Sequence, residues 1–161
     1  MGCDIHMYLE RYTSERNLKG PMSKSAKRDE AIDELLGEAK REPRWVTADD
    51  WYQEDGSWYQ SSSVYNRRNY HLFSALGVTW RGNADPLWIA ERGVPDDASE
   101  AFLYVAQQWE GDGHTFSWMT LEEMMSIENE EIKSCLSDVI ERMSMIESDP
   151  KKIRVCFFFD N

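Results

Sequence analysis

Residues 3–12 are Cys-Asp-Ile-His-Met-Tyr-Leu-Glu-Arg-Tyr, and this stretch decides the fold of the chain. Its apolar and polar side chains alternate, which predicts a β-strand with one face toward a core. Residues 153–159, Ile-Arg-Val-Cys-Phe-Phe-Phe, show the same period of two near the other end of the chain. We therefore predict that the first and last strands lie side by side in one sheet.

Between these two strands, the sequence pattern predicts mostly helices. Apolar residues recur there with the 3.6-residue period of a helix, and polar caps mark two of the starts, at Ser99 and Thr120. An Asp-Gly turn among the aromatic residues of 44–65 predicts a hairpin, and residues 111–114 are predicted to form a loop. The predicted helices cover residues 24–41, which Pro43 ends, about 70–76, 99–109 and 120–149.

Length and composition fit one domain. The chain has 161 residues, of which 41% are hydrophobic and 12% aromatic, and this is enough for a sizeable core. We expect a single α+β domain over residues 1–161, with a mainly antiparallel sheet that contains the N- and C-terminal strands and packs with about three to four helices. No apolar stretch approaches the roughly 20 residues that span a bilayer, so no membrane association is expected.

The net charge of −12 equals the charge of residues 96–149 alone, which hold 14 acidic and two basic residues. This balance argues against nucleic acid as a partner, because binding to nucleic acid neutralises phosphates with basic side chains. A solvated helix surface explains the acidic segment, and an acidic face that imitates DNA toward a host protein is the alternative. The odd number and wide spacing of Cys3, Cys135 and Cys156 indicate reduced thiols in the cytoplasm.

Two of the three histidines follow an aspartate at a spacing of two residues, Asp4 before His6 and Asp112 before His114. A carboxylate can hold an imidazole in one tautomer for acid–base catalysis, and the same residue types bind divalent metals such as Zn²⁺, Mn²⁺ or Fe²⁺. The alternative is structural. The first pair would then lie on the solvent face of an edge strand, and the second would stabilise a glycine turn.

Arg67-Arg68-Asn69-Tyr70 combines two guanidinium groups with an amide and a phenol. Arginine forks suit phosphate or carboxylate groups, and a tyrosine ring can stack on a base. The alternative is a helix start at which Asn69 is the cap and both arginines are exposed.

Five blocks of sequence resemble a family of small, largely uncharacterised proteins of bacteriophages, prophages and some bacteria. The blocks span nearly the whole chain, whereas residues 19–60, a predicted helix plus hairpin, resemble a family-variable insertion. The blocks are Met1-Gly-Cys-Asp-Ile-His6, Arg68-Asn-Tyr-x-Leu-Phe73, Arg92-Gly-x-Pro-Asp-Asp-x-Ser99, Trp109-x-x-Asp112-x-His114-x-x-Ser117-Trp118-x-Thr120-Leu121-x-Glu123 and Arg154-Val-x-Phe-x-Phe-Asp160-Asn161.

The resemblance implies which polar residues belong to one site, and it implies a bacterial host cell and a role against host defence. It transfers no established activity. The implied site comprises Asp4, His6, Arg68, Asn69, Tyr70, Asp96, Asp112, His114, Trp118, Asp160 and Asn161.

Two hypotheses follow for this site. The first is a phosphodiesterase-like hydrolase acting on a nucleotide-like or other phosphate-containing small molecule, in which His6 and His114 are base and acid or, with Asp4, ligands of a divalent metal. In that case Asp4 and Asp112 orient the histidines, Arg68 stabilises phosphate charge, and Tyr70 and Trp118 stack on the base. The second hypothesis is a non-catalytic protein that sequesters a nucleotide signal or a host protein.

Overall fold

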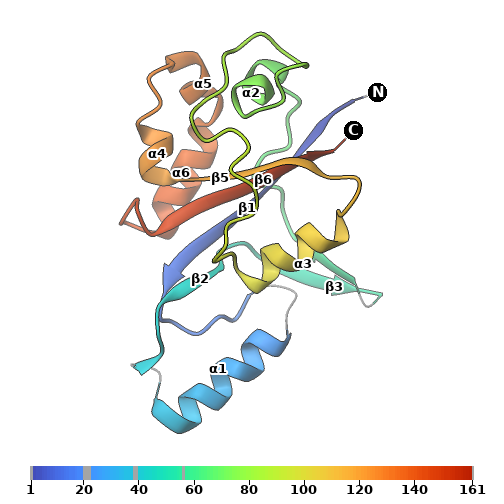
Figure 1. Cartoon of the computed structure of the whole chain (residues 1–161). Coiled ribbons are helices and arrows are strands. Elements are labelled where there is room, and N and C mark those ends of the chain that lie inside the picture. The colour runs from blue at the N-terminus through green and yellow to red at the C-terminus, as the bar shows by residue number, and fades with distance from the viewer. Residues whose placement is uncertain (1, 20–22, 38–39, 56, 161) are drawn as a thin grey trace.

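A four-stranded antiparallel sheet runs through the middle of the molecule, in the strand order β2-β1-β6-β5 (Figure 1). The computed structural model describes residues 2–19, 23–37, 40–55 and 57–160. The predicted class, a single α+β domain whose antiparallel sheet contains both terminal strands, is confirmed. The strands of this sheet are β1 (Asp4–Thr13), β2 (Arg44–Thr47), β5 (His114–Thr120) and β6 (Ile153–Asp160).

The first and last strands pair along most of their length, as the alternation of residues 3–12 and 153–159 predicts. Asp4 lies opposite Asp160 and Arg11 lies opposite Ile153. Because directly paired residues point to the same face, this register sorts the side chains of both strands into two shared faces. The two ends of the sequence therefore meet at one end of the sheet (Figure 1).

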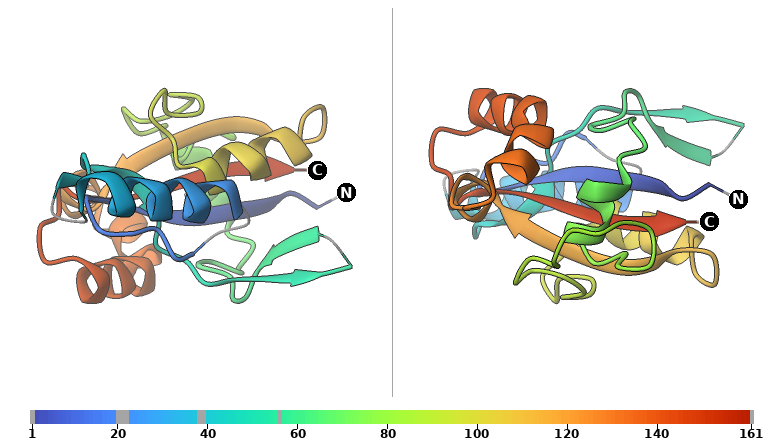
Figure 2. Two further views of the ribbon diagram at one scale, coloured as in Figure 1. Left: turned by 90° about the horizontal axis from the view of Figure 1, so that it is seen from below. Right: turned by 90° about the horizontal axis from the view of Figure 1, so that it is seen from above.

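One face of the sheet carries most of the helices (Figures 1 and 2). The predicted single helix over 120–149 is wrong, because the structure breaks this segment into three. Thr120 caps the first with a complete capping box, and Asn129 caps the second by accepting backbone N–H groups of the next turn. The helices on this face are α2 (Tyr70–Ala75), α4 (Leu121–Met125), α5 (Glu130–Cys135) and α6 (Ser137–Ile146).

The opposite face carries α3 (Glu100–Gln108) and a hairpin of β3 (Trp51–Glu54) and β4 (Ser57–Gln60). Both predictions are confirmed here, since Ser99 caps α3 and the hairpin forms within residues 44–65. A small core lies under α3, where Tyr8 and Phe158 from the sheet meet Phe102 and Val105 from the helix. This face is the less densely covered of the two, and it holds the candidate site.

A buried ion pair joins the two terminal strands below α3. The Arg154 Nε–H donates to Glu10 Oε1 at 2.6 Å, and both side chains are almost fully buried, at 2% and 1% exposure. The other Glu10 oxygen accepts the backbone N–H of Ser99 at 2.6 Å, and Arg154 also binds Asp97. The pair therefore anchors the start of α3 to the sheet.

The helix predicted over 24–41 ends earlier than expected. It forms α1 (Ser23–Leu36), and Gly37 follows in the left-handed region with a φ of 79°. Glycine adopts this conformation without a steric penalty and commonly terminates helices. Pro43 therefore does not decide where the helix stops.

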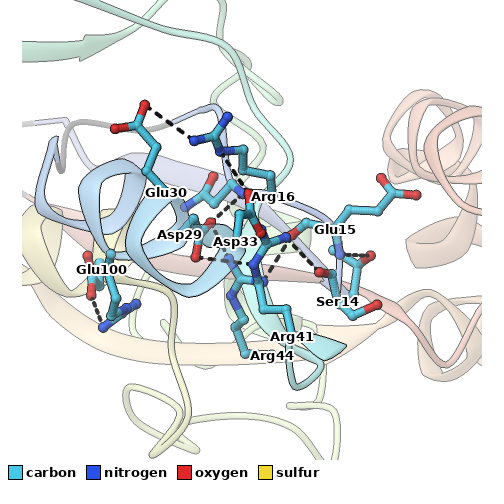
Figure 3. Close-up of polar contacts among 12 residues, drawn as sticks. Ser14, Glu15, Arg16, Asp29, Glu30, Asp33, Arg41, Arg44 and Glu100 are labelled. Atoms are coloured by element: carbon cyan, nitrogen blue, oxygen red, sulfur yellow. Dashed lines mark hydrogen bonds and ion pairs between the residues drawn. The ribbon is translucent and has the colours of Figure 1, made fainter. Parts of the chain in front are cut away.

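Ion pairs hold α1 on the domain (Figure 3). Asp29 of α1 is buried, accepts the backbone N–H of Asn17 at 2.7 Å and pairs with Arg41 and Arg44. Because Arg44 begins β2, this network links the helix to the central sheet. Residues 19–60 therefore contribute a strand of the main sheet as well as the predicted helix and hairpin.

Strand β5 is absent from the sequence prediction, which places His114 in a loop. The strand starts at His114 and pairs with β6, with an irregular register between His114 and Ser117. Thr115 adopts a positive φ of 56° at this bulge, which is uncommon for a β-branched residue. The bulge breaks the alternation by one residue, so the strand has no clear period of two. No helix in the described part of the chain is long and apolar enough to cross a membrane.

Candidate functional site

An imidazole–carboxylate pair lies where the two chain ends meet. The His6 Nε2 atom is 2.9 Å from Asp160 Oδ2, and the side chains are 25% and 23% exposed. His6 and Asp160 share a face because His6 lies opposite Phe158, two residues before Asp160. The sequence predicts both residues for the site, but it pairs His6 with Asp4 in the role that Asp160 takes.

The surroundings fix the His6 ring in place. It stacks on Phe158 with ring centroids 4.9 Å apart, and Trp109 lies 4.6 Å away on a tilted plane. When the Asp160 carboxylate accepts a hydrogen bond from His6 Nε2–H, the neutral ring keeps its lone pair on Nδ1. This is the tautomer in which Nδ1 can act as a general base.

Asp4 holds a different partner. Its two carboxylate oxygens accept from Arg68 Nε at 2.6 Å and from Arg68 Nη2 at 2.9 Å. The Arg68 guanidinium lowers the pKa of Asp4, and the Asp4 carboxylate raises the pKa of Arg68. The backbone N–H of Asp4 donates to the second oxygen of Asp160 at 3.4 Å. Arg68 is thus committed to a carboxylate, and Asp4 touches Asp160 through its backbone.

His114 lies on the other face of the sheet from His6. It is opposite Phe159 in the β5–β6 register, and the centroids of these two rings are 6.2 Å apart. His6 stacks instead on Phe158, the residue before Phe159. Successive residues of a strand point to opposite faces. The predicted partnership of His6 and His114 as base and acid is therefore not supported by this register.

The same register separates His114 from Asp4 and His6, the other two residues that the sequence suggests as metal ligands. Within the described ranges, no group of three or more His, Cys, Asp or Glu side chains is placed to hold a metal ion. His114 Nδ1 lies 2.9 Å from the Thr115 hydroxyl. A divalent metal held by these three residues is therefore not supported by their placement.

The remaining predicted site residues lie elsewhere. Asn69 caps α2 by accepting the Leu72 N–H at 3.1 Å, which is the structural alternative considered for it. Tyr70 begins the same helix and packs on Phe73. Asp112 is exposed in the turn after α3, and Asn161 lies outside the described residues.

Asp96 and Trp118 line a separate cavity of about 460 Å³ on the α3 face. The Trp118 ring lies 4.5 Å from the Arg92 guanidinium and 5.3 Å from that of Arg154. Arg92 also forms two hydrogen bonds to Glu123, at 3.0 and 2.6 Å. These structural contacts account for four residues of the sequence blocks, namely Arg92, Trp118, Glu123 and Arg154.

His6 opens into a cleft of about 310 Å³ between the hairpin and α3. This volume lies at the low end of the range for small-molecule sites. Figure 1 shows α3 and β3 on the same side of the sheet, away from α4–α6. The lining is dominated by rings: His6 and Tyr8 from β1, Trp51, Trp58 and Tyr59 from the hairpin, and Tyr104 and Trp109 from α3 and its C-cap.

Sequence periods explain why these side chains converge. His6 and Tyr8 are two residues apart on β1, and Trp58 and Gln60 are two apart on β4, so each pair shares one face of its strand. Tyr104 and Gln108 are four apart on α3 and share one face of the helix. Gln60 also donates to the Met7 carbonyl at 3.0 Å, which ties the hairpin to β1. The cleft is therefore built from β1, the β3–β4 hairpin and α3. No local sequence pattern shows that these three segments lie next to one another.

Most of this cleft is not predicted from the sequence. The aromatic residues of 44–65 indicate a hairpin, and none of them is among the predicted site residues. Seven Trp and seven Tyr in 161 residues are a signal that could have pointed to an aromatic surface. No protein-family model, curated protein or solved structure matches the chain.

Asp49 lies at the base of the hairpin and is fully buried. Its carboxylate accepts the Leu9 N–H at 2.6 Å, and the Arg142 guanidinium lies 3.6 Å from its other oxygen. Burial raises the pKa of Asp49 to about 6, despite these partners and the more distant Lys19. Burial, helped by the Asp49 charge, also raises the pKa of Tyr8, which keeps this phenol neutral in the cleft wall.

We expect the contribution of Asp49 to the free energy of unfolding to fall as the pH rises from about 4 to 6, because folded Asp49 holds its proton in a range where the unfolded chain has lost it. The difference between about 6 and the usual 3.8 corresponds to on the order of 3 kcal/mol. Asp49→Asn removes this contribution. We would measure urea unfolding at pH 4, 5, 6 and 7. The free energy of unfolding of Asp49→Asn should rise relative to that of the parent protein as the pH rises.

The matched control is Asp85→Asn, since Asp85 is exposed and lies in the segment between α2 and α3, away from the hairpin. This variant should keep the pH dependence of the parent protein. Parallel pH profiles for Asp49→Asn and the parent protein would contradict the assignment of the titration to Asp49.

Proposed function

We propose that the protein binds a nucleotide-like small molecule in the aromatic cleft and that His6 acts on this ligand as a general acid–base. The observation that carries the proposal is the 2.9 Å contact of His6 Nε2 with Asp160, at a cleft lined by aromatic rings. Aromatic side chains stack on the faces of bases, and a carboxylate-held imidazole is suited to proton transfer. The setting in a bacterial host cell, and a role against host defence, belong to the proposal through the resemblance alone.

In this mechanism Asp160 holds the ring and Nδ1 moves the proton. The Nε2–H bond to the carboxylate selects the tautomer, and the Asp160 charge stabilises the imidazolium that forms when Nδ1 accepts a proton. Phe158 and Trp109 restrict rotation of the ring. Asp4 and Arg68 position Asp160 from the side, because the Asp4 backbone donates to it.

We expect His6→Gln to lower turnover by about 100- to 10,000-fold, the usual contribution of a positioned general acid or base. The purified chain is incubated with nucleoside mono-, di- and triphosphates and with cyclic and linear dinucleotides, and the products are separated by chromatography. Binding of the same compounds is measured by calorimetry. His71→Gln is the matched control, since His71 lies 3.0 Å from Asn83 and lines no part of the cleft.

A second function, sequestration without chemistry, is favoured by the position of His114. A single imidazole in the cleft supplies one acid–base group, whereas cleavage with a base and an acid needs two such groups. Ligand that is bound by the parent protein and recovered unchanged would decide for sequestration. No binding and no turnover of any compound would contradict both functions.

A further inference from the structure

We propose that the cleft recognises a neutral planar heterocycle, a nucleobase or nucleoside, and that phosphate groups weaken the binding. This inference rests on the proposed function of the cleft and names the part of the ligand that the site selects. It changes the role expected for Arg68, which the sequence analysis assigns to phosphate charge.

The charge around His6 disfavours a phosphate group. Among the residues that the structure describes, those lining the cleft include no Lys and no Arg. At the adjacent end of the sheet, Arg68 already binds the Asp4 carboxylate in two hydrogen bonds, and the Asp160 carboxylate lies directly against His6. A phosphate near His6 would therefore meet the negative charge of Asp160, in a protein whose overall charge is −12.

The direction of α3 also disfavours an anion in the cleft. The helix turns its C-terminal residues to the cleft, with Tyr104, Gln108 and the C-cap Trp109 in the wall, while its N-cap Ser99 is bound by Glu10. Phosphates bind at helix N-termini, where free N–H groups and the helix dipole favour an anion. A helix C-terminus carries the opposite partial charge and disfavours an anion.

The groups in the cleft wall suit contact with a planar ring. Among the described residues, no aromatic ring stacks on Trp58 or on Tyr104, so neither wall residue has a stacking partner of its own. The Gln108 amide and the Ser57 hydroxyl add donors and acceptors to the same wall. Flat faces together with amide and hydroxyl groups match a base, which stacks through its face and hydrogen-bonds through its edge.

The test compares, for each of four bases, ligands that differ only in phosphate number. Dissociation constants of adenosine, guanosine, cytidine and uridine, and of the mono- and triphosphate of each, are measured for the full chain by titration calorimetry at low and at high salt. We expect at least one nucleoside to bind more tightly than its phosphorylated forms, with the difference shrinking as salt rises, because salt screens the repulsion. Methyl glucoside and inorganic triphosphate test a sugar and a phosphate alone.

Variants locate the binding in the cleft. Trp58→Ala should weaken nucleoside binding by about 5- to 150-fold, the effect of losing one stacking ring, and Trp58→Phe should restore part of the loss. Trp88→Ala is the control, since Trp88 is 55% exposed, bonds to Glu123 and lines no part of the cleft. It should bind as the parent protein does.

Two results would overturn the inference in distinguishable ways. Tightest binding by ATP, sensitive to Trp58→Ala, would reject the neutral ring and leave the proposed function in place. Binding of methyl glucoside without any nucleoside or nucleotide, or no binding of any compound, would reject the inference together with the proposed function.

Discussion

Glu10→Ala is expected to lower the free energy of unfolding by about 3–5 kcal/mol, because it leaves a buried guanidinium short of its counter-charge. Glu10 accepts hydrogen bonds from Arg154, from the backbone of Ser99 and from the Cys156 thiol, and it is 1% exposed. All three donors lose their acceptor in the variant. The measurement is urea unfolding at neutral pH, followed by circular dichroism.

Glu15→Ala is the matched control, because Glu15 also pairs with an arginine, Arg11, but is 67% exposed. Exposed ion pairs contribute about 0–1 kcal/mol, so this variant should unfold nearly as the parent protein does. The double variant Glu10→Met/Arg154→Met buries no unpaired charge. Its free energy of unfolding should therefore fall by less than the summed losses of the single variants Glu10→Met and Arg154→Met. Equal losses for Glu10→Ala and Glu15→Ala would show that the buried pair has no special role.

Phe158→Ala is expected to cost about 3–5 kcal/mol of stability and also to abolish ligand binding in the cleft. Phe158 is fully buried, and the His6 and Trp109 rings lie on it at 4.9 and 5.7 Å. Truncation leaves a cavity under both rings, so neither keeps its orientation. Urea unfolding measures the stability, and calorimetry with the nucleosides and nucleotides measures the binding.

The neighbouring residue supplies the control. Phe157 is equally buried, but it belongs to the core under the helices of the other face. Phe157→Ala should lose a similar stability and keep ligand binding, at a temperature where unfolding curves show both variants folded. If either alanine variant fails to fold, Phe158→Leu and Phe157→Leu make the same comparison with smaller losses. Binding lost equally in both pairs would contradict a specific role of Phe158 in the cleft.

Local patterns predicted those elements that carry a clear period or a cap in their own sequence. The alternation of residues 3–12 and 153–159 predicted β1 and β6, and caps at Ser99 and Thr120 predicted the starts of α3 and α4. The prediction failed where tertiary contacts override a local pattern. Strand β5 forms on the edge of β6 despite its bulge, and the long helical period of 120–149 breaks into three helices as they pack on the sheet.

The candidate site shows the same division. A spacing of two residues places Asp4 and His6 on one side of a strand, but it does not say which distant residue will complete the pair. The register of β1 with β6 places Asp160 at His6, whereas Asp4 pairs with Arg68 from the loop before α2. The register of β5 turns His114 to the opposite face, although its own spacing from Asp112 is the same as that of His6 from Asp4.

The opening stretch of residues 3–12 by itself determined a first strand with a polar face and, together with the closing stretch, a sheet that joins the two chain ends. Such information is local, because side chains alternate along any strand. Only the tertiary structure decided what that polar face meets. The hairpin and α3 close over His6 with aromatic rings because β-sheet register and helix packing are set by contacts between segments far apart in the sequence.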